Sequence, residues 1–302
     1  MSIPIAPPES PFDERPSPKD KKGSTASSSS TSEAAPSSTV ASAKPMPIEL
    51  PLTSFASTPH NVACIAFVLG ALWSTGLVLA LPNLPGWFAW STAAVAKLPE
   101  QSWWTTLMSN PQLGTYMASV AFFHLMEFVV TSMYNPGKLS VASYLLDNGA
   151  QYHIAHACGL IEAVLEERYF PAAYRQWKHS GAVYIAGFAL IAAGQILRSF
   201  AMISASSNFS HLLAYTKRPD HQLVKEGIYS WSRHPSYAGF YWWAVGTQVM
   251  LGNPICALLF IAILQYFFAG RIRIEEQYLV KFFGKEYEQY RATVPTRILF
   301  IP

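Results

Sequence analysis

Apolar runs long enough to cross a bilayer alternate with short polar segments along most of this chain. Residues 62–81, 113–134 and 181–203 are each roughly 20 residues of mostly apolar side chains. A helix of that length crosses the ~30 Å hydrocarbon layer of a membrane. The three segments are therefore predicted to be transmembrane helices.

Three further apolar segments are less regular. Residues 141–165 contain several ionisable side chains, which a spanning helix tolerates when they face the interior of a bundle. Residues 87–96 are flanked by prolines and predict either a short span or an aromatic anchor at the interface. Residues 237–270 are too long for one ordinary span. They are broken at Gly252-Asn253-Pro254, which predicts a helical hairpin whose second helix starts at Pro254.

The pattern divides the chain into three parts. Residues 1–59 are rich in Ser and Pro and are predicted to be a disordered cytosolic tail rather than a signal peptide, because their beginning has no apolar core. Residues 60–205 are predicted to form a transmembrane bundle. Residues 206–302 carry the hairpin and an amphipathic tail. The predicted fold is an all-α, polytopic integral membrane bundle of about seven or eight transmembrane helices.

Composition and charge support a membrane protein and exclude other classes. Charged residues make up 13% of the chain, against ~25% in an average soluble protein. The net charge of +3 is too small for a nucleic-acid partner, which needs a concentrated basic face. The three cysteines lie far apart, which fits neither a disulfide framework nor a zinc site. Lys and Arg concentrate in residues 217–233 and 271–297, so this side, with both termini, is predicted to be cytosolic.

The densest polar cluster precedes the predicted hairpin. His234 comes directly before Pro235, which predicts that His234 lies at a helix N-terminus. Free N–H groups there attract a carboxylate or a phosphate, and Gly239 allows a close approach of backbone or ligand. The alternative is a basic and aromatic belt at the membrane interface, without a binding role.

A second cluster follows the hairpin. Arg271 and Glu275 are four residues apart and share a helix face, so the alternative is a solvated salt bridge. An amphipathic stripe continues beyond them with Tyr278, Leu279, Phe282, Phe283 and Tyr287. The hairpin brings this cluster to the same membrane face as His234, which favours one shared pocket.

Other polar residues lie inside the predicted spans. Arg198 stands near the end of its span and either extends to lipid headgroups or contributes to the pocket. The remaining residues lack the H-E-x-x-H pattern of a zinc site, and we expect them to pack or pair within the bundle. These are His124, Glu127, His153, His156 and Glu162. No metal site is predicted.

Several short strings are similar to the isoprenylcysteine carboxyl methyltransferase family of the endoplasmic reticulum. They include Leu197-Arg198-Ser199-Phe200, Arg233-His234-Pro235-Ser236-Tyr237-Ala238-Gly239, Asn253-Pro254, the pair Glu275-Glu276, and Val294-Pro295-Thr296. The resemblance covers residues 197 to 302 closely and the upstream part more loosely. Phospholipid N-methyltransferases and some sterol reductases carry a similar C-terminal segment, and the flanking strings favour the first family.

The resemblance implies a reaction and a set of site residues. The reaction is methyl transfer from S-adenosylmethionine to the α-carboxylate of a C-terminal prenylated cysteine on CaaX proteins such as small GTPases. Arg271 would guide the substrate carboxylate, with Arg198 as a possible second guide, and the prenyl chain would lie between helices. The implied cofactor-binding residues are His221, Gln222, Leu223, Val224, Tyr229, His234, Pro235, Ser236, Tyr237 and Glu275. Ala214 departs from the family, which has a cofactor-contacting Gln at that position.

Overall fold

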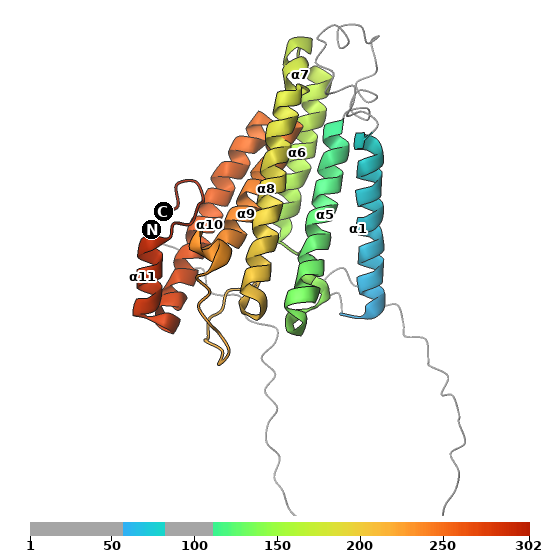
Figure 1. Cartoon of the computed structure of the whole chain (residues 1–302). Coiled ribbons are helices and arrows are strands. Elements are labelled where there is room, and N and C mark those ends of the chain that lie inside the picture. The colour runs from blue at the N-terminus through green and yellow to red at the C-terminus, as the bar shows by residue number, and fades with distance from the viewer. Residues whose placement is uncertain (1–56, 82–110) are drawn as a thin grey trace, which may run out of the picture. The chain divides into compact units, whose positions relative to one another are not determined.

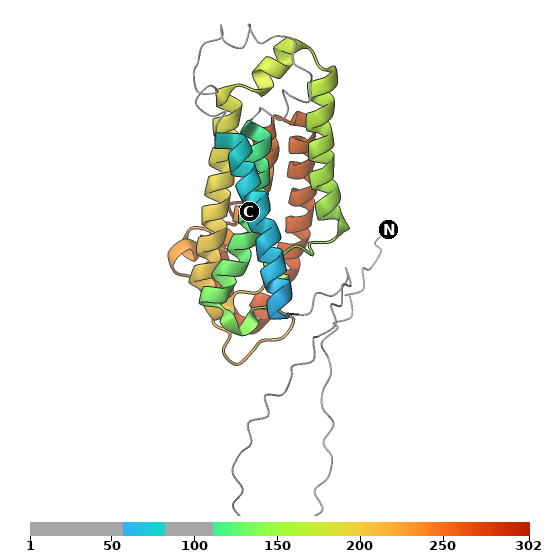
Figure 2. The ribbon, with the colours of Figure 1, turned by 90° about the vertical axis from the view of Figure 1, so that its right-hand side faces the viewer.

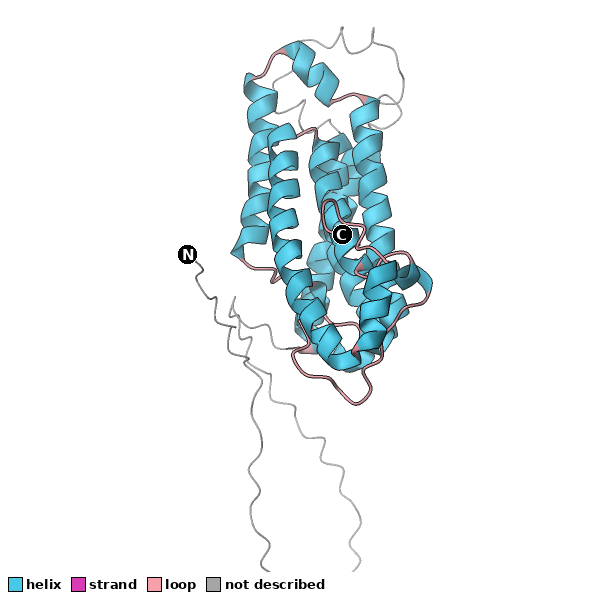
Figure 3. Cartoon of the chain, turned by 90° about the vertical axis from the view of Figure 1, so that its left-hand side faces the viewer, coloured by secondary structure: helices cyan, strands magenta, loops and turns pink. Residues whose placement is uncertain are grey.

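The computed structural model describes residues 57–81 and 111–302, which form helices joined by loops (Figures 1 and 3). Within these residues the only β pairing is a single bridge between Ile298 and Ile301. The prediction of an all-α fold is confirmed. Most of the tail predicted over residues 1–59, and the segment 87–96, lie outside the described residues.

The helices follow the apolar pattern, with some shifted boundaries. The α-helices are α1 (Pro59–Ala80), α5 (Pro111–Tyr134), α6 (Ala150–Tyr169), α7 (Ala172–Lys178), α8 (Gly181–Ala205), α9 (Pro235–Leu251), α10 (Pro254–Phe283) and α11 (Lys285–Thr293). The 3-10 turns are η2 (Pro136–Lys138), η3 (Val141–Tyr144), η4 (Ser206–Asn208) and η5 (Gly227–Ser230). The turn between α9 and α10 falls at Gly252 and Asn253.

Among the described residues, four helical stretches are long and apolar enough to cross a membrane. They are Pro59–Ala80, Pro111–Tyr134, Ala172–Asn208 and Pro254–Phe283. The chain is therefore an integral membrane protein. The larger number of seven or eight spans stays a prediction.

Two helices differ from the predicted segments. The helix expected over 141–165 begins at Ala150, because Leu145 and Gly149 adopt positive φ angles of 56° and 80° that interrupt a right-handed helix. The helix predicted as the second of a hairpin, α10, continues past residue 270 to Phe283. Its 30 residues correspond to about 45 Å, which exceeds the hydrocarbon thickness of a bilayer, so the part carrying Arg271 and Glu275 extends to the membrane surface.

Small residues let the central helices approach closely. A Cβ atom added at Gly194 of α8 would lie 2.4 Å from the backbone nitrogen of Trp243 in α9, and one at Gly239 of α9 would lie 2.6 Å from the nitrogen of Arg198 in α8. Gly76 of α1 meets Gly114 of α5 in the same way, at 2.5 Å, and Figure 2 shows α1 lying across α5. Glycine at these positions removes the side chains that would separate the helices.

The arrangement gathers the polar segments at one end of the bundle. The C-terminal end of α8, the N-terminal end of α9, the last turns of α10 and all of α11 lie together there (Figure 1). Aromatic packing fills the interior beside them, with the rings of Phe123 and Trp243 stacked at 4.2 Å between centroids. An apolar core thus lies next to the polar end of the bundle.

Candidate functional site

The N-terminus of α9 forms one wall of the site. His234 is the N-cap residue and Pro235 occupies the first helical position, as the sequence predicted. The segment before the helix is fixed, because Arg233 N–H donates to the carbonyl of Pro295 at 3.1 Å and Ser232 Oγ donates to the carbonyl of Thr296 at 2.6 Å. The amide of Ser236 in the first turn has no acceptor within its own helix and is available to a ligand.

Two adjacent glutamates of α10 flank the His234 ring. Nδ1 of His234 lies 3.9 Å from Oε2 of Glu275, and its Nε2 donates to Oε1 of Glu276 at 3.2 Å. Glu276 also accepts from Arg233 Nε at 2.5 Å. This ion pair is mostly buried, so it holds the start of α9 against α10 and fixes the orientation of the imidazole ring. The predicted meeting of His234 and Glu275 in one pocket is confirmed.

The hydroxyl of Tyr237 lies between Arg271 and Glu275. It donates to Glu275 Oε2 at 2.6 Å and accepts from Arg271 Nε at 2.8 Å. Arg271 Nη2 donates to the backbone carbonyl of His211 at 2.6 Å. The two charged groups are thus joined through a tyrosine rather than by the simple surface salt bridge that their spacing allowed.

A cavity of about 120 Å³ opens between these elements. All ten residues that the family resemblance implied as cofactor-binding line it. It is also lined by Ala205, Asn208, Phe209, Ser210, Arg233, Leu279, Phe283, Tyr287 and Tyr290. The cavity therefore combines a helix N-terminus and a carboxylate with apolar and aromatic walls, a set of groups suited to a charged nucleoside.

The loop after α8 closes one side of the cavity. Gln222 N–H donates to Asn208 Oδ1 at 2.9 Å, which fixes the backbone of residues 221–224. Burial lowers the pKa of His221 below its usual value, and the nearby cations Arg218 and Lys138 lower it further. The imidazole of His221 is therefore neutral at neutral pH. Burial, and secondarily the charge of Glu275, raises the pKa of Tyr229 above its usual value, so this hydroxyl keeps its proton.

Some cavity residues were not assigned by the sequence. Leu279, Phe283 and Tyr287 belong to the amphipathic stripe. That stripe could have pointed to the cavity, because an apolar helix face outside the membrane is expected to pack against another part of the protein or a ligand. Asn208 ends the short 3-10 turn η4 and Phe209 follows it, and neither residue was assigned a role from the sequence. Their position depends on how the loop folds over the end of α8.

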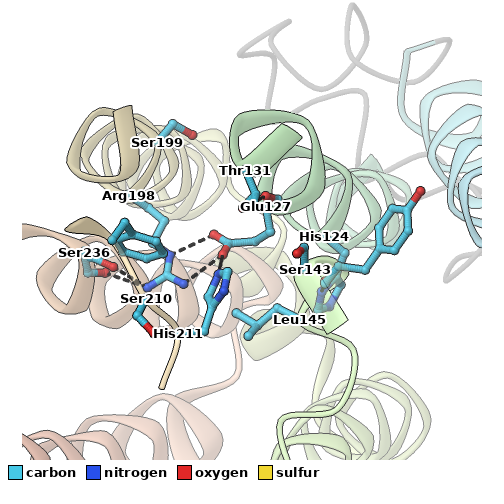
Figure 4. A network of polar contacts seen from close by, with 12 residues as sticks. His124, Glu127, Thr131, Ser143, Leu145, Arg198, Ser199, Ser210, His211 and Ser236 are labelled. Carbon is cyan, nitrogen blue, oxygen red and sulfur yellow. Dashed lines mark hydrogen bonds and ion pairs between the residues drawn. The ribbon is translucent and has the colours of Figure 1, made fainter. Parts of the chain in front are cut away.

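Arg198 is placed differently from both sequence interpretations. It is 5% exposed and does not reach the lipid headgroups. Its Nε and Nη2 each donate to one carboxylate oxygen of Glu127 at 2.8 Å, and Nη1 donates to Ser236 Oγ at 2.5 Å (Figure 4). Ser236 lines the cavity, but the Arg198 guanidinium lies behind it and does not line the cavity. Ala214 is exposed and also absent from that lining.

Comparison with known proteins identifies relatives of this chain. Residues 186–281 match the isoprenylcysteine carboxyl methyltransferase (ICMT) family. A protein-S-isoprenylcysteine O-methyltransferase from Saccharomyces cerevisiae is 43% identical over 62% of this chain and 79% of its own length. One from Xenopus laevis is 33% identical over 82% of this chain and 85% of its own length. The Homo sapiens protein of that name is 39% identical over 65% of this chain and 69% of its own length.

A solved structure has the same fold. It is a eukaryotic intramembrane Ras methyltransferase of the ICMT type, determined without a monobody, and is 33% identical with a TM-score of 0.67. The match covers 80% of this chain and 77% of that one. Because sequence identity extends over most of each relative and the structures superpose, this chain belongs to the isoprenylcysteine carboxyl methyltransferase family.

Proposed function

We propose that this protein transfers a methyl group from S-adenosylmethionine to the C-terminal carboxylate of a prenylated cysteine. The observation that carries the proposal is the juxtaposition of Arg271 and Glu275 around the Tyr237 hydroxyl, beside the cavity and at the end of a membrane-embedded bundle. Arg271 offers a cation for an acidic substrate, and Glu275 offers an anion for a cationic cofactor. Both side chains contact the same Tyr237 hydroxyl. The names of the relatives described above support the same reaction.

The residues around the cavity fit the cofactor. S-adenosylmethionine carries a carboxylate, an ammonium group and a ribose, and when bound it supplies an electrophilic methyl group. The N-terminus of α9 and His234 suit the carboxylate, and Glu275 suits the ammonium or the ribose hydroxyls. The apolar walls from Leu223, Val224 and Phe283 suit the adenine ring.

Arg271 is proposed to orient the acceptor. A guanidinium keeps its charge and can hold a carboxylate through two hydrogen bonds. A terminal carboxylate has a pKa of about 3.5 and is already ionised at neutral pH, so the protein needs no general base to activate it. The task of the site is to align the reacting groups and to exclude water.

The membrane setting supports a lipidated substrate. The long helix α10 carries Arg271 to the surface, so a carboxylate can meet it while an attached prenyl chain stays among the apolar helices. Processed CaaX proteins such as small GTPases have this chemistry. We further propose seven or eight spans including a hairpin of α9 and α10, and a location in the endoplasmic reticulum membrane with both termini and the cavity facing the cytosol.

The test is methyl transfer by membranes that contain the protein. Radiolabelled S-adenosylmethionine is supplied with N-acetyl-S-farnesylcysteine, and label is expected in a base-labile ester on that acceptor. Phosphatidylethanolamine in place of the farnesylcysteine should remain unlabelled, and NADPH should not be consumed with a sterol substrate. Labelling of the phospholipid amine instead would make the protein an N-methyltransferase and would contradict the proposal.

A further inference from the structure

A buried polar network joins Glu127, Arg198 and His211 (Figure 4), and the backbone of His211 contacts Arg271, the proposed substrate-binding arginine. The centre of the network is Glu127 of α5, whose side chain is 1% exposed at the protein surface. The carboxylate accepts two hydrogen bonds from Arg198 and a third from His211 Nε2 at 2.9 Å. An acidic side chain inside a membrane bundle is costly, so its presence there points to a specific role.

The network reaches the loop that carries His211. This loop has no regular secondary structure at residue 211, so its backbone position depends on side-chain contacts. His211 is held on two sides, by the bond to Glu127 and by edge-to-face packing of its ring on Phe209, at 5.1 Å between centroids. The bond to Glu127 therefore fixes the place of the His211 backbone on the bundle.

The backbone of His211 in turn fixes Arg271. Its carbonyl accepts from Arg271 Nη2 at 2.6 Å, while Arg271 Nε donates to the Tyr237 hydroxyl at 2.8 Å. These two acceptors lie on different elements, one on the loop and one on α9. They determine the direction of a guanidinium whose stem is otherwise a flexible chain.

We propose that Glu127 and His211 are positioning residues, which hold the Arg271 guanidinium where it receives the substrate carboxylate. This inference rests on the function proposed above. Neither side chain lines the cavity, and His211 reaches the site through the bond of its carbonyl to Arg271. Loss of the His211–Glu127 bond should therefore affect the acceptor and leave cofactor binding intact.

The experiment replaces His211 in the full chain. His211→Phe keeps a planar ring for the contact with Phe209 but removes the N–H donor. We expect the KM for N-acetyl-S-farnesylcysteine to rise about tenfold or more, with the Kd of S-adenosylhomocysteine changed less than about twofold. His211→Gln, which carries an N–H at a similar distance from its Cα, should restore the KM to within about threefold of the wild-type value.

Two further variants sharpen the result. His60→Phe is the matched control, because His60 is exposed on α1, at the side of the bundle away from α10 (Figure 1), and its kinetics should equal those of the wild type. Glu127→Gln offers one oxygen where the carboxylate offers two, so it should also raise the KM. Its cofactor Kd is free to change, because Glu127 holds Arg198, which donates to Ser236 in the cavity wall. If that variant does not fold, the His211 pair still decides the question.

The outcomes separate this inference from the function on which it rests. A wild-type protein without methyl transfer would refute both. An active wild type with an unchanged KM in His211→Phe would refute only the positioning role. A joint rise of KM and of the S-adenosylhomocysteine Kd, not restored by Gln, would mean that His211 merely stabilises the fold.

Discussion

At the scale of single residues, Arg271 is proposed to hold the acceptor and Glu275 is proposed to hold the cofactor. The two side chains meet at the Tyr237 hydroxyl, but only Glu275 lines the cavity. The acceptor and the cofactor should therefore be separable by mutation.

Replacement of Arg271 is expected to remove activity without removing the cofactor. In Arg271→Ala, the substrate carboxylate loses its proposed cationic guide, and we expect kcat/KM for farnesylcysteine to fall at least about a hundredfold, since a charge-assisted bidentate contact contributes about 3 kcal/mol. The Kd of S-adenosylhomocysteine, measured by titration calorimetry, should change little. Glu275→Ala should have the opposite effect and mainly weaken the binding of S-adenosylhomocysteine.

A control lies two residues away on the same helix. Arg273 is exposed, so Arg273→Ala removes an equal charge from α10 without touching the site. Near-normal turnover in Arg271→Ala, or an equal loss in Arg273→Ala, would contradict the assignment of Arg271.

A single residue, His221, also predicts how stability and cofactor binding depend on pH. Burial and nearby cations lower the pKa of His221 in the folded protein, while the unfolded chain keeps a value near about 6.5. The unfolded chain thus binds the proton more tightly, and stability rises with pH between the lowered and the ordinary pKa. We expect cofactor binding to be constant from about pH 7 to 8 and to weaken only on acidification through the lowered pKa of folded His221, which lies below the ordinary value of about 6.5, because a protonated His221 repels the cationic donor.

The measurement is the Kd of S-adenosylmethionine across that range. His221→Asn has no titrating ring, so its binding should vary less with pH than that of the wild type. A turnover rate that follows a single ionisation between pH 7 and 8 would contradict both this expectation and the absence of a general base.

At the scale of elements, the sequence predicted the helices and motifs better than it predicted the contacts between helices. The break before α10 and the N-cap at His234 could be read locally, because Pro restricts its own φ and the conformation of the residue before it. The pairing of Arg198 with Glu127 joins residues 71 positions apart. It depends on how α5, α8 and α9 pack, and no local pattern encodes that arrangement.

The same packing makes a prediction for Gly239. The sequence allowed a close approach of either backbone or ligand there, and the structure shows the backbone of α8. In Gly239→Ala, the added Cβ would lie 2.6 Å from Arg198 N, so α9 must move away from α8. We expect a loss of about 1–3 kcal/mol in stability, as in other overpacked cores, seen as a lower temperature of aggregation in detergent.

Gly270 of α10 provides the comparison. A Cβ at this helical position meets nothing within 4 Å, so Gly270→Ala should be neutral or slightly stabilising. Equal stability of the two variants would show that α8 and α9 can separate without cost.

At the scale of the whole molecule, the distribution of charge predicts an orientation in the membrane. The cavity end carries the basic segments 217–233 and 271–297, whereas the opposite end at α7 carries only Arg175 and Lys178 within residues 172–180. Lys178 is itself buried against Glu166, with 2.6 Å between Nζ and Oε2. An excess of Lys and Arg in short loops marks the cytosolic side, so the cavity should face the cytosol, where soluble S-adenosylmethionine is available.

Cysteine labelling tests this orientation. Arg218→Cys places a thiol in the exposed loop beside the cavity, and Gln176→Cys places one on exposed α7 at the other end, each in a background with the three native cysteines replaced. In sealed vesicles with the cytosolic face outward, a membrane-impermeant maleimide should label position 218 directly and position 176 only after detergent is added. The opposite order would place the basic segments on the wrong side of the bilayer. The methyl donor would then have no access to the cavity, and the proposed reaction would have to be abandoned whatever the geometry of Arg271 and Glu275.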